Sequence, residues 1–226
     1  MNYATAKDYL DAHLAFVDSR IAKDKNESNV RNLQDYRKKI NDVRLAEVMM
    51  KLNVACDFVV SSRNADAQFN VHSLKRVAEL ARLFANNETV THMNAMFLSC
   101  IRSVFNLSAA DLDCNAEDFR AACSLECNAF SAEREKHIER YTTTRASAST
   151  ASAQTSMNVN ALQVFNIIKR VASMSRTHAY RVNYDSEATK LLASKLSLKM
   201  KENNVTEASE SEATDKKASR RKKNSD

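Results

Sequence analysis

The sequence predicts a mostly α-helical protein, with a bundle of about five helices followed by a small basic C-terminal module that is helical or α+β. The 226-residue chain contains no glycine, no proline and no tryptophan, although glycine and proline normally make up about 7% and 5% of a protein. Apolar residues also recur at helical spacing over its first two thirds. All-β folds depend on Gly/Pro-rich turns, and phosphate-binding loops depend on glycine, so the composition argues against both.

The first 60 residues carry helix-start signals and two apolar stripes. Thr5 and Asp8 have the spacing of a capping box, and residues 26–29 predict a break because asparagine tolerates the left-handed conformation. A long helix is expected over residues 33–59, and since it is apolar on two sides it belongs at the centre of a bundle. The stripe of the first helix is Tyr3, Leu10, Leu14, Val17 and Ile21.

Three further helices complete the bundle predicted for residues 1–141. One starts after Ser73 and stops at residues 86–87, and the next starts at Thr89. Asn115 and Asp118 signal the start of the last helix. Its expected apolar face consists of Phe119, Cys123, Cys127, Phe130, His137 and Tyr141.

The chain changes character after residue 141. Thirteen of the sixteen residues 142–157 are Ser, Thr or Ala, which predicts a flexible linker, with a frayed helix as the alternative. Residues 158–201 form the basic module, which begins with a helix over residues 162–174. Apolar residues then alternate at 180–184 and at 196–200, which predicts two strands with a short helix between them. A continuous helix over residues 186–201 is the competing prediction. Residues 202–226 are expected to be a disordered tail, acidic and then basic.

The net charge of +6 is concentrated in one segment of the chain. Residues 1–158 hold 20 basic and 20 acidic side chains, and residues 202–226 hold 6 of each. Residues 159–201 hold 8 basic and 2 acidic side chains, together with several tyrosines. Cations beside aromatic rings are what phosphate contact and base stacking require.

We therefore predict a non-enzymatic accessory protein that binds DNA or RNA with little sequence specificity. The predicted phosphate contacts are Lys169, Arg170, Arg176, Arg181, Lys195 and Lys199. Tyr180 and Tyr184 are the predicted stacking residues. A basic face that only keeps the protein soluble is the competing interpretation. No apolar run is long enough to span a membrane, so a cytoplasmic protein is expected, or a nuclear one if the host has a nucleus.

No cofactor or metal is predicted. Cys123 and Cys127 lie one helical turn apart, but they share an apolar stripe and lack the usual C-x₂-C spacing of zinc ligands. Residues 111–117 alternate like a calcium loop, yet Ala116 stands where that loop needs glycine. With five cysteines and no secretory signal, reduced and packed thiols are expected.

Two other function classes stay open. The two-sided apolar helix favours a scaffolding protein that associates with copies of itself. A metal-dependent nuclease is the second alternative, although no spacing of carboxylates assigns its site. The absence of Gly, Pro and Trp also suggests a gene that avoids the dinucleotides GG and CC, since only these three residues require one in every codon.

Overall fold

The computed structural model describes residues 3–64, 67–86, 93–140, 145–171 and 178–201. Within these ranges the chain is mostly helical and contains a small three-stranded sheet. The predicted mostly α-helical character is therefore confirmed. The predicted tail and the expected helix start at Thr89 lie outside the described residues.

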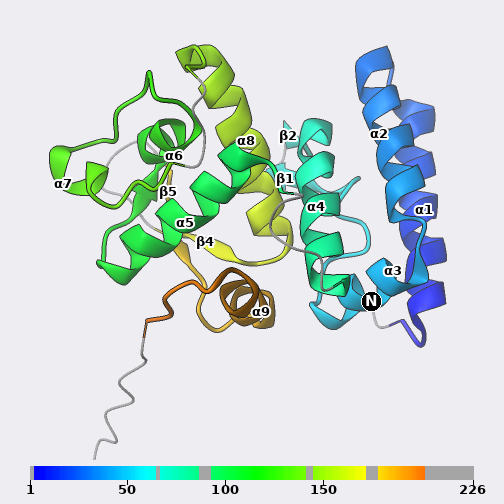
Figure 1. Ribbon diagram of the computed structural model, residues 1–226. Helices are drawn as coiled ribbons and strands as arrows, with labels where there is room; N and C mark the ends of the chain where they lie inside the picture. Colours follow the sequence, from blue (N-terminus) through cyan, green and yellow to red (C-terminus); the bar gives the residue numbers. More distant parts are fainter. Residues whose placement is uncertain (1–2, 65–66, 87–92, 141–144, 172–177, 202–226) are drawn as a thin grey trace, which may run out of the picture.

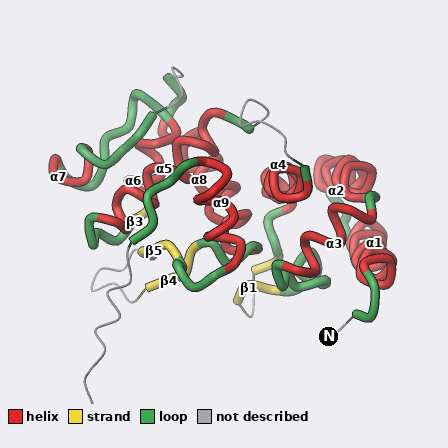
Figure 2. Tube along the Cα trace, turned by 60° about the horizontal axis from the view of Figure 1, so that its bottom comes forward, coloured by secondary structure: helices red, strands yellow, loops and turns green. Residues whose placement is uncertain are grey.

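In the described part of the N-terminal region, the helices α1 to α4 lie together on one side of the molecule (Figures 1 and 2). The predicted capping box is present at the start of the first, with Thr5 and Asp8 bonded reciprocally. A two-stranded antiparallel ribbon and a short 3-10 turn connect the third and fourth helices. The elements are α1 (Ala6–Lys23), α2 (Glu27–Ile40), α3 (Val43–Lys51), β1 (Ser62–Asn64), β2 (Ala67–Gln68), η1 (Val71–Ser73) and α4 (Leu74–Ala85).

The single helix expected over residues 33–59 is wrong. The chain leaves the helix after Ile40, and the Asp42 carboxylate accepts a hydrogen bond from the Arg44 backbone N–H, which starts α3 as a new helix. Short polar side chains compete in this way with helix continuation. α3 then ends at Lys51, and Asn53 adopts the left-handed conformation with φ 55°.

The C-terminal region contains the other helices and the three-stranded sheet. α8 packs against α4, α5 and α6, so it connects the two regions (Figure 1). The sheet is antiparallel with the order β3-β5-β4. The elements are α5 (Ala95–Ala109), β3 (Cys114–Asn115), α6 (Ala116–Cys123), α7 (Ala132–Glu135), α8 (Ala148–Val164), β4 (Ile168–Val171), β5 (Ala179–Val182) and α9 (Glu187–Leu196).

The predicted long helix after Asn115 is also wrong, because α6 stops at Cys123. Ser124 is extended, and its buried hydroxyl donates a 2.7 Å hydrogen bond to the Ala146 carbonyl. The chain therefore leaves the helix at Ser124, and the apolar residues that follow at helical spacing do not continue α6. Phe130, assigned to the apolar face, is 60% exposed.

Most of the described part of the segment predicted as a flexible linker is helical, since residues 148–157 form the first turns of α8, whereas residues 145–147 precede the helix. Ser147 caps this helix, and its small side chains allow close packing, so that Ala151 is fully buried. The expected helix over residues 162–174 ends early at Val164, followed by Asn166 with φ 54° and then by β4. The division into separate units remains a prediction.

The alternation at residues 180–184 did indicate a strand, since β5 contains Tyr180 and Val182. The short helix expected after it is α9, whereas the strand expected at residues 196–200 is absent, because α9 extends to Leu196 and Ser197 follows with φ 50°. One cluster of buried apolar residues runs from Tyr9 in α1 to Leu196 in α9.

Candidate nucleic-acid interface

The strands β4 and β5 carry four of the predicted contact residues. Lys169 on β4 is opposite Arg181 on β5, and Arg170 is opposite Tyr180. Because side chains alternate along a strand, Lys169 and Arg181 share one face, and Arg170 and Tyr180 share the other. The Tyr180 ring lies 6.1 Å from the ring of the fully buried Phe119, so this second face is the one toward the core.

Arg181 is held by two acidic residues from the turn between α5 and β3. Its guanidinium forms an ion pair with Asp113 and a 3.9 Å pair with Asp111, and it donates to the Asp111 carbonyl at 3.0 Å. Lys201 also pairs with Asp111. These two cations lower the pKa of the Asp111 carboxyl, Lys201 having the larger effect. Two cations of the segment, Arg181 and Lys201, are thus paired with the carboxylates of this turn.

The remaining described cations of the segment fall into two groups. Lys190 pairs with Glu187, and the half-buried Lys195 donates to the Asn86 carbonyl at 3.1 Å. Lys169, Arg170 and Lys199 are exposed, and none of them forms an ion pair with a carboxylate of the described residues. Arg176 lies outside the described residues.

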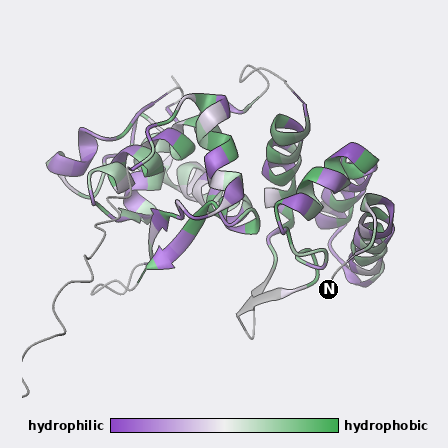
Figure 3. Ribbon diagram, turned by 90° about the horizontal axis from the view of Figure 1, so that it is seen from below, coloured by the Kyte–Doolittle hydropathy of each residue, from purple (hydrophilic) through white to green (hydrophobic). Residues whose placement is uncertain are grey.

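The exposed cations of β4 lie at an edge of the sheet. β4 pairs with β5 on one side and with no other strand of the described residues. The Arg170 guanidinium contacts the imidazole of His178 on the chain that leads into β5. Figure 3 shows hydrophilic residues along the strands β4 and β5 (purple). A polyanion that lies along this edge can reach both Lys169 and Arg170, although their side chains point to opposite faces.

Both predicted stacking tyrosines belong to the core packing. Tyr180 meets Phe119 edge to face, and the Tyr184 ring lies perpendicular to Phe105 at 6.4 Å. The Tyr184 hydroxyl is buried and has no hydrogen-bond partner among the described residues. Burial raises the pKa of this phenol, with a smaller contribution from Asp111. The structure therefore does not place either ring on the face that carries Lys169.

Sequence reasoning missed the residues that neutralise Arg181. The alternation of residues 111–117 indicated only a calcium loop. The pairing of Asp111 and Asp113 with a strand about seventy residues later has no local signature.

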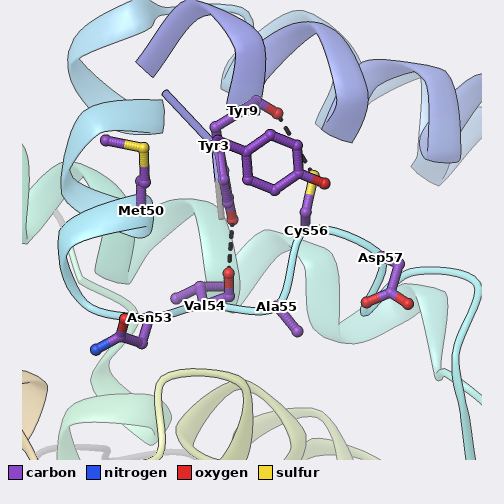
Figure 4. A pocket seen from close by; sticks show the side chains of 8 residues that line it. All are labelled: Tyr3, Tyr9, Met50, Asn53, Val54, Ala55, Cys56 and Asp57. Atoms are coloured by element: carbon purple, nitrogen blue, oxygen red, sulfur yellow. Dashed lines mark hydrogen bonds between the residues drawn. The ribbon is translucent and has the colours of Figure 1, made fainter. Parts of the chain in front are cut away.

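The described residues also line a pocket of about 430 Å³ in the N-terminal region (Figure 4). Tyr9 donates to the Val54 carbonyl at 3.1 Å, and the Cys56 thiol donates to the Tyr9 carbonyl at 3.5 Å. A hydrogen bond with Cys56, and then burial, raise the pKa of Tyr3 to about 12. Burial also raises the pKa of the Cys56 thiol. Both shifts favour the protonated forms of the Tyr3 phenol and the Cys56 thiol.

Comparisons with family models, with curated proteins and with solved structures give no match for this chain. Among the described residues, no three His, Cys, Asp or Glu side chains gather where they would hold a metal ion. No helix in the described ranges has both the length and the apolar character needed to cross a membrane.

Proposed function

We propose that this chain binds DNA or RNA through its phosphates, with little sequence specificity, along the edge of β4. The observation that carries the proposal is the pair Lys169 and Arg170. Both are exposed on an edge strand, and neither has a carboxylate partner among the described residues, whereas Arg181 beside them has two.

The charge pattern supports contact with a polyanion. The rest of the chain has equal numbers of basic and acidic side chains, so the +6 excess belongs to residues 159–201. Each phosphate neutralised by a lysine or arginine releases counterions, which makes such binding sensitive to salt. Lys199 and Arg176 remain predicted contacts. Arg181 is better assigned to positioning β5, because its guanidinium is already engaged by Asp111 and Asp113.

The helices of residues 1–141 would provide a rigid body for packing or for self-association, in the cytoplasm or in a nucleus. The helix with two apolar faces predicted over residues 33–59 favoured a scaffolding protein. The structure divides this helix into α2 and α3, and Leu45 and Met49 of α3 are buried in the core, so the scaffolding alternative has less support.

The test is fluorescence anisotropy with single- and double-stranded DNA and RNA across a salt series. We expect the variant Lys169→Ala/Arg170→Ala to bind more weakly and to reduce the slope of log K against log salt by about two. The matched control is Lys190→Ala/Glu187→Ala, which removes an ion pair and leaves the net charge unchanged. Binding by the Lys169/Arg170 variant with the wild-type slope would contradict the proposal.

Two further measurements distinguish the alternatives. Cleavage of the oligonucleotide only when magnesium is added would favour a nuclease over a binding protein. Light scattering without nucleic acid tests for self-association, and a stable oligomer combined with no nucleic-acid binding would favour the scaffolding protein.

A further inference from the structure

Two buried cysteines meet where α5, α6 and α8 pack together. Cys100 on α5 and Cys123 at the end of α6 are both fully buried, and their sulfur atoms lie 3.4 Å apart. Asn158 of α8 directs its side-chain amide at both sulfurs, with Nδ2 at 3.2 Å from Cys100 and 3.7 Å from Cys123. The two sulfurs therefore share one polar donor.

A buried arginine fixes the orientation of that amide. The Nε of Arg76 donates to Asn158 Oδ1 at 3.2 Å, and its Nη2 donates to Gln154 Oε1 at 3.3 Å. Since the amide oxygen is engaged by Arg76, the NH₂ group has to face the sulfurs. Glu79 pairs with the same guanidinium. An amide donor with a cation behind it stabilises a thiolate more than a thiol.

The two thiols consequently differ in acidity. The hydrogen bond from Cys100 is the largest of the effects that lower the pKa of Cys123, and Asn158 and Arg76 add to it. Burial, followed by the neighbouring Cys123, raises the pKa of Cys100. One sulfur is thus suited to attack as a thiolate and the other to remain a thiol, as in a nucleophile and its resolving partner. Cys114 is equally buried but has no second thiol in contact.

We propose that Cys100 and Cys123 form a disulfide when the protein meets a small hydroperoxide. The Cys123 thiolate attacks one peroxide oxygen, the O–O bond breaks, and a sulfenic acid forms while the leaving oxygen departs as water after protonation. The Cys100 sulfur then attacks the Cys123 sulfur, the S–S bond forms, and the sulfenic oxygen leaves as a second water. For hydrogen peroxide, two thiols lose two electrons and two protons in total, and the peroxide is reduced to two waters.

The test is treatment of the native full chain with hydrogen peroxide, followed by alkylation, trypsin digestion and mass spectrometry. Cleavage after arginine places Cys123 and Cys127 on one fragment and Cys100 on another. The background Cys127→Ser therefore makes the assignment unambiguous. We expect a cross-link between the fragments of Cys100 and Cys123, and its persistence in the matched control Cys114→Ser.

The single variants test the assigned roles. Cys123→Ser should abolish the cross-link, and Cys100→Ser should leave a Cys123 sulfenic acid that dimedone traps. The cross-link in the wild-type chain needs no variant to fold, so it decides the proposal by itself. Oxidation confined to the partly exposed Cys127, or reaction of Cys100 and Cys123 only after unfolding, would overturn it.

A second inference rests on how the helices end. α3, α5, α8 and α9 are each followed by a residue in the left-handed conformation, with φ between 50° and 59°. In each case the next residue is apolar, and its N–H bonds the carbonyl five residues earlier, at 2.9 Å. This is the Schellman motif, in which glycine is the usual left-handed residue. Here the four positions hold Asn53, Asp111, Asn166 and Ser197.

Glycine is thus missing even where the backbone favours it, which points to a cause outside folding. The methionines give an independent indication. The only methionine codon ends in G, and the codons of Ala, Val, Asp and Glu begin with G, so any such pair creates GG. None of the eight methionines is followed by one of these residues. Every other neighbouring pair in the chain has codons that avoid both GG and CC.

We infer that the coding sequence excludes GG and CC throughout, and that this exclusion, not folding, removed glycine from the helix ends. Reading the coding DNA tests the first part, and GG or CC at optional codon positions would overturn it. Asn166→Gly and Ser197→Gly test the second: each should raise the melting temperature by about 1–3 °C. Unchanged or lower melting temperatures would overturn it, and Ser194→Gly, inside α9, should be destabilising as the control.

Discussion

Two helices of the described residues begin with a capping box, one in each region, and the two boxes differ in what surrounds them. Thr5 and Asp8 at the start of α1 are exposed, and their side chains bond only within the box. Asn115 and Asp118 at the start of α6 form the same reciprocal bonds, but Asp118 is fully buried. The same short motif is thus a local helix start in the N-terminal region and part of the tertiary structure in the C-terminal region.

One buried polar side chain from each region, His13 and Asp118, shows a further difference. In the N-terminal region His13 is neutral: its Nδ1 lies 2.6 Å from the Cys56 carbonyl and must donate, so its Nε2 accepts from the Tyr36 hydroxyl at 2.9 Å. In the C-terminal region the buried Asp118 carboxylate faces the Arg134 guanidinium at 2.8 Å. Of these two buried sites, the one around His13 is organised by neutral hydrogen bonds and the one around Asp118 by an ion pair.

The largest expected effect comes from removing the buried carboxylate. Asp118 accepts from the Asn115 and Phe130 backbones and from Arg134. Asp118→Ala should lower the free energy of unfolding by about 3 kcal/mol, because it leaves a partly buried cation and two N–H groups without their acceptor. Urea denaturation measures this, with Asp8→Ala as the matched variant in the exposed box. Equal decreases in the free energy of unfolding for Asp118→Ala and Asp8→Ala would show that the two capping boxes do not differ in their role.

A smaller loss is expected in the neutral network. Tyr36→Phe removes the hydroxyl that donates to His13 and leaves Nε2 without a partner in the core. The expected decrease in the free energy of unfolding is about 1–2 kcal/mol, again from urea denaturation. The matched control is Tyr184→Phe, because the buried Tyr184 hydroxyl has no hydrogen-bond partner among the described residues. A Tyr36→Phe variant as stable as wild type would show that the hydrogen bond contributes nothing.

The buried neutral histidine of the N-terminal region should make the stability of the protein depend on pH. Burial lowers the pKa of His13 below the ordinary 6.5, although the bond to the Cys56 carbonyl opposes the shift. The stability from neutral His13 is therefore complete above pH 6.5 and decreases as the pH falls from there toward the lower folded pKa. Urea midpoints between pH 7.5 and about pH 5 measure the decrease. His13→Gln should flatten this dependence, whereas the exposed His72→Gln should preserve it.

The smallest effect is expected at the exposed cap. Thr5→Ala removes the side-chain acceptor of the Asp8 N–H and should cost about 1 kcal/mol. Thr5→Ser keeps the hydroxyl and should restore most of the stability. A loss as large as that of Asp118→Ala would mean that the N-terminal cap also has a tertiary role, contrary to its exposure.

Local signals predicted the helix starts after Thr5, Ser73 and Asn115 and a break at Asn26, because a cap is encoded within four residues. They did not predict the starts after Asp42, Asn94 and Ser147. Thr5, Asn26 and Asn115 each cap a helix in the structure. The helix ends were harder to predict, since the left-handed residues that end α3 and α8 are asparagines, which also occur inside helices. Without glycine the sequence lacks its clearest stop signal.

The candidate site was predictable only in part. The charge count located the basic segment, and the alternation located β5. The sequence did not reveal that Asp111 and Asp113 pair with Arg181, because this depends on β3 lying next to β5. Nor did it reveal that Tyr180 and Tyr184 pack against phenylalanines from α6 and α5.

Lysine acylation with and without a bound oligonucleotide tests the central claim most directly. Labelling would be quantified at each lysine by mass spectrometry, at low salt and with the nucleic acid in excess. The account predicts strong protection of Lys169 and unchanged labelling of Lys7 and Lys51, which are exposed on the N-terminal helices. Unchanged labelling of Lys169 in a saturated complex, or protection centred on the N-terminal helices, would contradict it.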